Sequence, residues 1–201
     1  MATSAQPESS EVSTPDEFSR LAELVQLVHQ ELPRQRMLLS EKVAQRSYSM
    51  AHLLGLDDLT CERIRVAGRI HRVGELFLSA DFLDKNYLQM SKQEICTYRS
   101  YPIFSALRVS KDVSSEVYGI LLNHREYCSG FGFLCADNDV PLGARILCLA
   151  TEYEELCMYY GGDAHQEDVV LRRMMKNTLG RYDERAIKAL LLSVAREHTI
   201  H

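Results

Sequence analysis

A short run of residues, H-R-V-G-E at 71–75, has the outline of a metal-binding site. Apolar side chains recur around it at helical spacing, which predicts a helix with one face against the core: Val66, Ile70, Val73 and Phe77. His71 would lie in the middle of this helix, where a ring nitrogen can point into a cavity and bind a metal ion. The next residue is Arg72, and a divalent cation does not accept an arginine as a ligand. The run therefore has the form of a metal site without its chemistry.

The composition bounds the class of protein. The 201 residues are 46% hydrophobic and 25% charged, which is typical of one soluble domain with a sizeable core. The net charge of −5 disfavours wholesale binding to nucleic acid or to an anionic membrane. The six cysteines form no C-x-x-C pair, no signal peptide is recognisable, and no apolar run reaches the roughly 20 residues of a membrane span. We expect a cytoplasmic protein with reduced thiols.

Helical periodicity runs through most of the chain, and no alternating β pattern of any length occurs. We expect a disordered tail at 1–14, an N-terminal helix at 15–34 and one domain at 35–197. The fold class is therefore all-α, a single helical bundle. Its predicted helices cover about 35–54, 59 through the His71 run, 91–100, 101–111, 115–124, 141–160, 165–178 and 183–197.

The longest break in the helical pattern extends from 127 to 140. It contains two glycines and two aromatic residues in alternation: Gly130, Phe131, Gly132 and Phe133. Loops of this length in compact domains tend to be functional or mobile. Exposed phenylalanines on such a loop would be good anchors for a protein interface. The alternative is that both rings pack inward and hold the loop in place, and the sequence leaves both interpretations open.

Five segments occur in the order and spacing of the HD-GYP family, a branch of the HD superfamily that hydrolyses the bacterial messenger cyclic di-GMP. Family members read H-S-E-R-V-A, H-D-x-G-K, H-P, H-H-E-x-x-D-G-x-G-Y-P, and I-P-L-x-A-R-I-L followed by A-D. This chain resembles them over about 35–195. The corresponding segments are L-S-E-K-V-A at 39–44, H-R-V-G-E at 71–75, Y-P at 101–102, H-R-E-Y-C-S-G-F-G-F-L at 124–134, and V-P-L-G-A-R-I-L at 140–147 followed by A-T at 150–151.

The departures from the family pattern fall on its metal ligands. The resemblance implies that the ligand positions here are Leu39, His71, Arg72, Tyr101, His124, Arg125 and Thr151. Of these, only His71 and His124 can still bind a metal, and two histidines are too few for a stable Zn²⁺ or Fe²⁺ centre. The family's signature lysine, which helps to hold the substrate phosphate, is Glu75 in this chain.

The replacements are also electrostatically incompatible with a di-metal centre. A dication about 4 Å from Arg72 would be repelled by roughly 8 kcal/mol at an effective dielectric near 20, and Arg125 adds a second repulsion of the same kind. Leu39 lies on an apolar helix face, and Tyr101 can fill the volume of a former imidazole. Arg72 and Glu75, three residues apart, can pair and neutralise each other. We expect no bound metal and no other cofactor.

Several of these residues have plainer interpretations. His71 and His124 are either relic ligands or core histidines inherited with the fold. Arg145 could contact a phosphate, or it could be a structural ion-pair partner. Glu126, Glu75 or Glu152 could supply an oxygen to a weak relic site. The glutamates at 152, 154 and 155 are expected to form a solvated helix face.

The resemblance and the lost ligands together predict a catalytically inactive, HD-GYP-like regulatory module of bacterial signalling that acts through protein contacts. A GGDEF-type cyclase or another signalling protein is the expected partner, and a homodimer is a further possibility. The alternative is a receptor that binds cyclic di-GMP or a related nucleotide without cutting it, with phosphate-binding charge from Arg72, Arg125 and Arg145. A divergent metal-dependent phosphodiesterase is the third interpretation.

Overall fold

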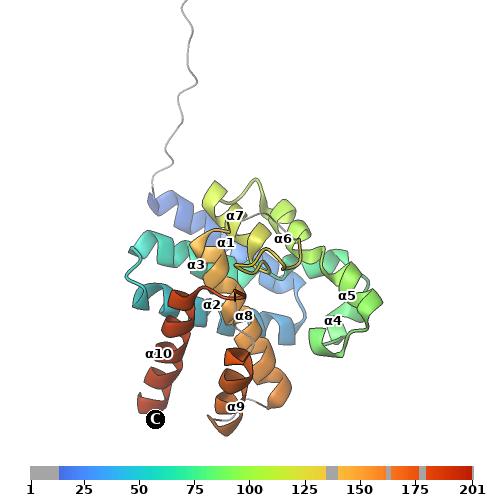
Figure 1. Ribbon diagram of the computed structural model, residues 1–201. Coiled ribbons are helices and arrows are strands. Elements are labelled where there is room, and N and C mark those ends of the chain that lie inside the picture. Colours follow the sequence, from blue (N-terminus) through green and yellow to red (C-terminus); the bar gives the residue numbers. More distant parts are fainter. Residues whose placement is uncertain (1–13, 135–139, 162–163, 177–179, 201) are drawn as a thin grey trace, which may run out of the picture.

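Helices make up every regular element in the part of the chain that the computed structural model describes, which is residues 14–134, 140–161, 164–176 and 180–200 (Figure 1). The predicted tail at 1–14 lies almost wholly outside these residues. The α-helices are α1 (Thr14–Glu31), α2 (Arg34–Leu53), α3 (Asp58–Ile70), α4 (Asp81–Asp84), α5 (Lys92–Tyr98), α6 (Tyr101–Val109), α7 (Ser115–Asn123), α8 (Leu142–Tyr160), α9 (Ala164–Met175) and α10 (Glu184–Ile200), and two short 3₁₀ helices are η1 (Val73–Phe77) and η2 (Tyr87–Gln89). The all-α prediction is confirmed.

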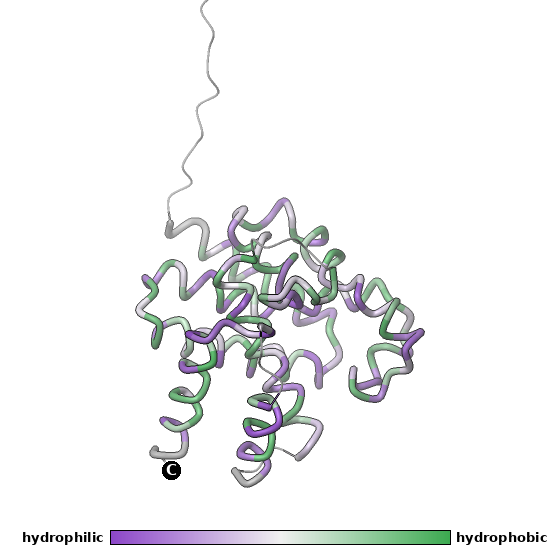
Figure 2. The backbone as a smooth tube through the Cα atoms, in the orientation of Figure 1, coloured by the Kyte–Doolittle hydropathy of each residue, from purple (hydrophilic) through white to green (hydrophobic). Residues whose placement is uncertain are grey.

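Helices α2 and α8 form the centre of the bundle. Helix α2 packs against α3, α8 and α10, while α8 also contacts α7 and α9. Figure 2 shows hydrophobic and hydrophilic residues alternating within single helices, which is the pattern of helices that bury one face. The buried apolar residues of these helices join in one core cluster, and its largest members without solvent exposure include Met50, Ile64, Ile70, Leu121, Ile146 and Leu147.

Helix α1 contributes to the same core as the rest of the bundle. Leu21, Leu24, Val25 and Val28 are buried on one of its faces, and α1 contacts α3 and η1. Such a face would be exposed to water if α1 stood apart. The predicted division into an N-terminal helix at 15–34 and a domain at 35–197 stays a prediction. Helix α1 and the helices that follow it share one core.

The helix predicted through the H-R-V-G-E run is wrong. Helix α3 ends at Ile70, His71 is its C-cap residue, and the chain continues in the 3₁₀ helix η1. Val73 is fully buried as expected, but the side chain of Phe77 is 56% exposed. The change of direction brings η1 against α6, where a Cβ atom on Gly74 would lie 2.1 Å from the carbonyl oxygen of Tyr101. The lack of a side chain at this position permits the close approach.

Several other helix boundaries have local causes in the sequence. Ser91 forms a capping box with Glu94 at the start of α5, and Ser114 caps α7. Helix α8 ends at Gly161, whose φ of 102° is in the left-handed region. Among the described helices, none has the length and apolar character needed to cross a membrane.

Candidate functional site

Two buried histidines from separate helices face each other in the middle of the bundle. His71 is the C-cap of α3 and His124 is the C-cap of α7, and both are fully buried. Their ring centroids lie 5.2 Å apart in an edge-to-face arrangement. Each Nδ1 bonds to a backbone carbonyl three residues earlier, at 2.6 Å, on Gly68 and Leu121 respectively. These bonds fix both rings with Nε2 directed away from the helix ends.

The two Nε2 atoms have different surroundings. The hydroxyl of Tyr101 lies 2.9 Å from Nε2 of His124 and can donate to it. Nε2 of His71 has no hydrogen-bond partner among the described residues. Burial lowers the pKa of His124 to about 3, and burial together with the nearby Arg72 charge lowers the pKa of His71 well below its usual value. Both rings are therefore neutral at pH 7.

Arg72 has no solvent exposure and sits in a network of buried charges beside the histidines. Its Nη1 pairs with Glu75 and lies 3.2 Å from the hydroxyl of Tyr98, while its Nη2 pairs with Glu155 of α8. The Tyr98 hydroxyl donates to Glu75 at 2.5 Å. The second oxygen of Glu155 accepts from Nη1 of Arg125 at 3.1 Å. Two arginines and two glutamates thus share one buried cluster, and the predicted pairing of Arg72 with Glu75 is present.

The charges in this network hold one another in their ionised forms. Burial alone would lower the pKa of Arg72, but the carboxylate of Glu75 and the other acidic groups nearby raise that pKa well above its usual value. Burial would likewise raise the pKa of the Glu155 carboxyl, but Arg125 and Arg72 outweigh it and leave this pKa lowered. Removal of either partner would leave an unpaired charge in the interior, which is strongly unfavourable.

Arg36 connects the buried network to the residues at the end of helix α4. Its Nε lies 3.2 Å from an oxygen of Glu75. The same guanidinium donates to the carbonyls of Phe82, Leu83 and Lys85, at 2.7–3.1 Å, around the end of helix α4. Arg36 therefore ties the end of α4 to the buried charges.

The expectation of a solvated face at Glu152, Glu154 and Glu155 is wrong, since all three are at most 9% exposed. Glu154 pairs with Arg46 at 2.9 Å, and Glu155 pairs with Arg72 and Arg125. The site residues that were not predicted from the sequence are Arg36, Tyr98 and Glu155. A usable signal existed, because two arginines at predicted interior positions require carboxylates, and the E-Y-E-E run at 152–155 directly follows the last motif segment.

The glycine-rich loop treats its two phenylalanines differently. The side chain of Phe131 is 79% exposed, whereas Phe133 is buried against Tyr98 and Tyr101. Neither of the two interpretations of this pair, both exposed or both packed inward, is right as a whole. A carboxylate oxygen of Glu126 accepts from the backbone N–H of Leu134. Glu126 thus holds the loop through its backbone.

Gly132 and Gly130 are required by the geometry of this loop. A Cβ atom on Gly132 would lie 2.4 Å from the carbonyl oxygen of Arg125 and 2.5 Å from Cα of Glu126. Gly130 has a φ of 73°. Both positions therefore exclude ordinary side chains, one by space and the other by backbone conformation.

Three further predicted positions lie in or near the core. Leu39 is buried, and the hydroxyl of Thr151 donates to the carbonyl of Leu147 at 2.7 Å within α8. Neither side chain offers a metal ligand here. Arg145 pairs with Asp183 at 3.3 Å and does not line the cavity described next, which accords with the structural ion-pair interpretation.

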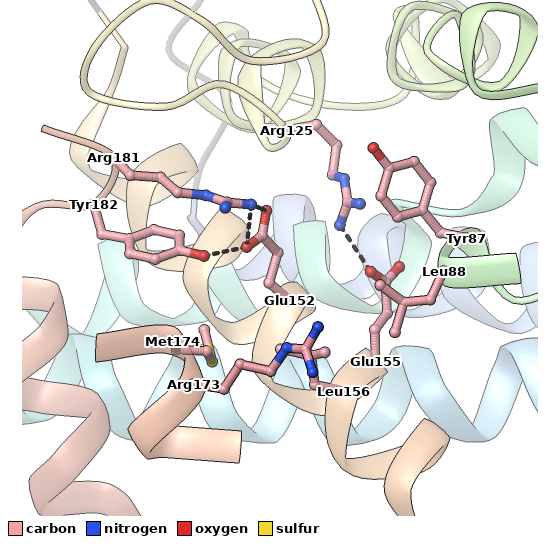
Figure 3. Close-up of a pocket in the computed structure, with 10 residues that line it drawn as sticks. All are labelled: Tyr87, Leu88, Arg125, Glu152, Glu155, Leu156, Arg173, Met174, Arg181 and Tyr182. Carbon is pink, nitrogen blue, oxygen red and sulfur yellow. Dashed lines mark hydrogen bonds and ion pairs between the residues drawn. The ribbon is translucent and has the colours of Figure 1, made fainter. Parts of the chain in front are cut away.

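A cavity of about 220 Å³ opens beside the buried network, between α8, α9 and η2 (Figure 3). Arg125 and Glu155 form its boundary with the network. The other lining residues are Tyr87, Leu88, Glu152, Leu156, Arg173, Met174, Arg181 and Tyr182. An adjoining cavity that shares Tyr87 and Glu155 extends toward α2. This is where a ligand could approach the former motif residues.

The residues present do not fit a di-metal centre. Among the described residues, no group of three or more histidine, cysteine, aspartate or glutamate side chains is arranged to hold a metal ion. Of the two histidines, only His71 has an unoccupied ring nitrogen. The nearest carboxylates are already bound by arginines. The chemistry of the donor set thus disagrees with metal catalysis of the kind described for two-metal hydrolases.

Comparison with known proteins places the fold. A family model described as HD domain matches residues 18–186, a span that starts within α1. Bd1817, an HDGYP protein from Bdellovibrio bacteriovorus, is 20% identical with a TM-score of 0.66, over 77% of this chain and 50% of that one. The chain thus spans half the length of Bd1817. No curated protein sequence matches the chain significantly.

The match to a second solved structure spans nearly the whole of that structure's chain. The HD domain of the phosphodiesterase PgpH from L. monocytogenes, in complex with cyclic-di-AMP, is 13% identical with a TM-score of 0.61, over 89% of this chain and 97% of that one. The same domain without the ligand gives a TM-score of 0.61 at 12% identity. At these identities the likeness establishes the fold and leaves the chemistry to the residues themselves.

Proposed function

Because the chain belongs to the HD-domain family, we propose that it is a catalytically inactive, HD-GYP-like regulatory module of bacterial signalling that acts by binding. One observation carries the proposal: the guanidinium of Arg72, at the position where the family resemblance implies a ligand aspartate, is bound by the carboxylates of Glu75 and Glu155. A metal ion would have to displace this buried cation. The lack of ligands at Leu39, Tyr101 and Thr151 supports the same conclusion.

The expected binding partner is another protein. Phe131 presents its ring to solvent between Gly130 and Gly132, in a segment that Gly132 and Glu126 hold in place. A rigidly held exposed aromatic ring is a good interface anchor, since little conformational entropy is lost when it is buried. A GGDEF-type cyclase is the partner that the family resemblance suggests, and a second copy of this chain is the other.

Metal analysis combined with a hydrolysis assay tests the proposal. The purified full chain, incubated with Zn²⁺, Mn²⁺ or Fe²⁺ and desalted, should retain well under one equivalent of metal. It should not hydrolyse cyclic di-GMP or cyclic di-AMP. Hydrolysis that disappears in a His71→Ala variant which still folds would overturn the proposal.

A second candidate function is a receptor that holds a phosphate-bearing signal without cutting it. The observation in its favour is that the cavity is lined by three arginines, Arg125, Arg173 and Arg181. The PgpH domain of similar fold was solved with cyclic-di-AMP bound. Of the arginines first predicted for this role, Arg72 is fully buried in ion pairs and Arg145 pairs with Asp183, so only Arg125 remains suitable. Titration calorimetry with cyclic dinucleotides, with no heat expected for the protein-partner role alone, separates the two candidates.

A further inference from the structure

We infer that the cavity between α8, α9 and η2 is a binding site for a compact aromatic anion, a single planar ring that carries one carboxylate or phosphate. The inference rests on the proposed loss of the metal centre, because without metal ions the protein's own cations must hold the negative group. It narrows the receptor candidate to a ligand class that neither the family nor the solved structures indicate.

The carboxylates near the cavity are already satisfied. Glu152 accepts from Arg181 at 3.0 Å and from the hydroxyls of Tyr127 and Tyr182. Glu155 accepts from the two arginines of the buried network. Neither carboxylate therefore retains an unshared charge that would repel an incoming anion.

Positive charge is in excess around the cavity. The buried network and the cavity wall together contain five arginines, Arg36, Arg72, Arg125, Arg173 and Arg181, against three glutamates, Glu75, Glu152 and Glu155. This local surplus of positive charge stands against a net charge of −5 for the whole chain. Three of these arginines, Arg125, Arg173 and Arg181, line the cavity, and at the buried Arg125 the attraction for an anion is screened less than at the open surface.

Two of the arginines have donors to spare. Arg125 is 2% exposed and gives one hydrogen bond, to Glu155, so its other guanidinium N–H groups have no acceptor in the described part of the chain. Arg173 bonds only to the hydroxyl of Tyr160, at 2.7 Å, among the same residues. In Figure 3 both guanidinium groups extend toward the same space, Arg125 from the end of α7 and Arg173 from α9. A carboxylate or phosphate accepts well from such a pair.

The rest of the wall suits an aromatic ring. Tyr87 and Tyr182 lie on opposite sides of the cavity in Figure 3, and Leu88, Leu156 and Met174 complete the lining. Two tyrosine rings and a methionine are favourable neighbours for a planar apolar group. The volume of about 220 Å³ is below the roughly 300–1,000 Å³ of sites for drug-sized ligands. One ring with one anionic group fits this space, whereas a cyclic dinucleotide has two bases and two phosphates.

Isothermal titration of the full chain with phenyl phosphate, benzoate and the neutral analogue benzyl alcohol tests the inference. We expect binding of at least one of the two anions at millimolar concentration or below, and none of the alcohol. The affinity should fall as salt is added, because the contact is between charges. A cyclic dinucleotide should not compete with the bound anion.

Two neighbouring arginines provide a matched pair of variants. Arg173→Gln removes an exposed arginine at the cavity wall and should weaken anion binding by about two- to fivefold, the loss typical of a solvent-accessible charge contact. Arg172→Gln removes the same charge one residue earlier, where the side chain is 79% exposed and pairs with Asp168, and should leave the affinity unchanged. Thermal unfolding of both variants checks that they fold.

The outcomes separate this inference from the proposed function. No binding of either anion, equal binding of the neutral alcohol, equal losses in the two variants, or displacement by a cyclic dinucleotide would each overturn the inference. None of these results would restore metal binding or hydrolysis, so the proposed loss of catalysis would stand. Metal-dependent hydrolysis would overturn the proposed function, whatever the titration gave.

Discussion

Arg72 is a guanidinium without contact to solvent, and its stability in the folded protein depends on Glu75 and Glu155. A buried arginine is tolerated only when its charge and most of its donors are matched. The family resemblance implies a metal-binding aspartate at this position. Under the proposed function, the arginine found here makes the neighbouring carboxylates the partners of a cation in place of metal ligands.

Removal of one carboxylate from this network should be costly. Glu155→Gln leaves Arg72 and Arg125 without a shared counter-charge, and we expect the free energy of unfolding to fall by about 3–5 kcal/mol. Urea unfolding followed by circular dichroism measures the change. Asp168→Asn, which breaks an exposed ion pair with Arg172, is the control and should have little effect. Similar losses in both variants would mean that the buried network does not carry the stability assigned to it.

Restoration of the family's aspartate should not restore the metal. Arg72→Asp places a third carboxylate beside Glu75 and Glu155 but leaves Leu39, Tyr101 and Thr151 without donor atoms suited to a metal. We therefore expect a destabilised protein that still binds well under one equivalent of Zn²⁺ or Mn²⁺, measured by elemental analysis after desalting. Two equivalents in this variant would show that the ligand set is larger than the side chains suggest.

The junction between α3 and η1 explains why one predicted element was wrong. A 3₁₀ helix has three residues per turn, so the apolar spacing at Ile70, Val73 and Phe77 continues to look helical after the α-helix has ended. The close contact of Gly74 with α6 depends on a chain segment about 30 residues later. Local periodicity predicted most of the helices, but it contained no information about that contact.

Substitution of the two phenylalanines of the glycine-rich loop should have different effects on stability. Phe133→Ala should lower the free energy of unfolding by about 3 kcal/mol, because the ring is buried among Tyr98, Tyr101 and the guanidinium of Arg125. Phe131→Ala should leave stability nearly unchanged, because its ring is 79% exposed. Thermal unfolding measures both.

The Phe131→Ala variant also tests the proposed interface. If Phe131 is the anchor for a protein partner, this variant should show reduced capture of a purified GGDEF-type cyclase domain or reduced formation of a homodimer, while the fold stays intact. Size-exclusion chromatography with light scattering and a direct binding assay give the two readouts. Unchanged binding of a partner by Phe131→Ala would rule out Phe131 as the anchor.

At the scale of the whole molecule, the fold and the local pair Arg72–Glu75 could be predicted from the sequence, but the long-range pairing of the buried charges could not. Helix patterns and segment order sufficed for an all-α HD-type bundle, which the family match and the solved structures confirm. The partners Arg72 and Glu155 lie 83 residues apart, and Arg46 and Glu154 lie 108 apart. Each of these glutamates on its own resembles a surface residue, because the arginine that pairs with it lies far away in the sequence. The sequence therefore predicted an exposed face at 152–155.

The two buried histidines make the stability of the whole bundle depend on pH. The pKa of His124 is about 3 in the folded chain, against about 6.5 for an unperturbed histidine, and the pKa of His71 is shifted in the same direction. Between these values the unfolded chain binds protons that the folded chain excludes. The free energy of unfolding should therefore fall on acidification, by about 1.4 kcal/mol per pH unit for each histidine.

Urea titrations between about pH 7 and pH 5 measure this effect at a pH where Glu155, whose pKa is lowered, keeps its charge. Burial raises the pKa of Glu154, and because a histidine variant retains Glu154, comparison with the unmodified chain isolates the contribution of the histidine. His124→Asn removes one of the two histidines that the folded protein keeps unprotonated. The asparagine is neutral and has similar hydrogen-bonding ability. The slope of stability against pH should then fall by about half, whatever the variant's stability at pH 7. An unchanged slope would mean that His124 can bind a proton in the folded protein. The centre beside Arg72 would then admit positive charge more readily than its burial implies, and the argument against a metal ion there would weaken with it.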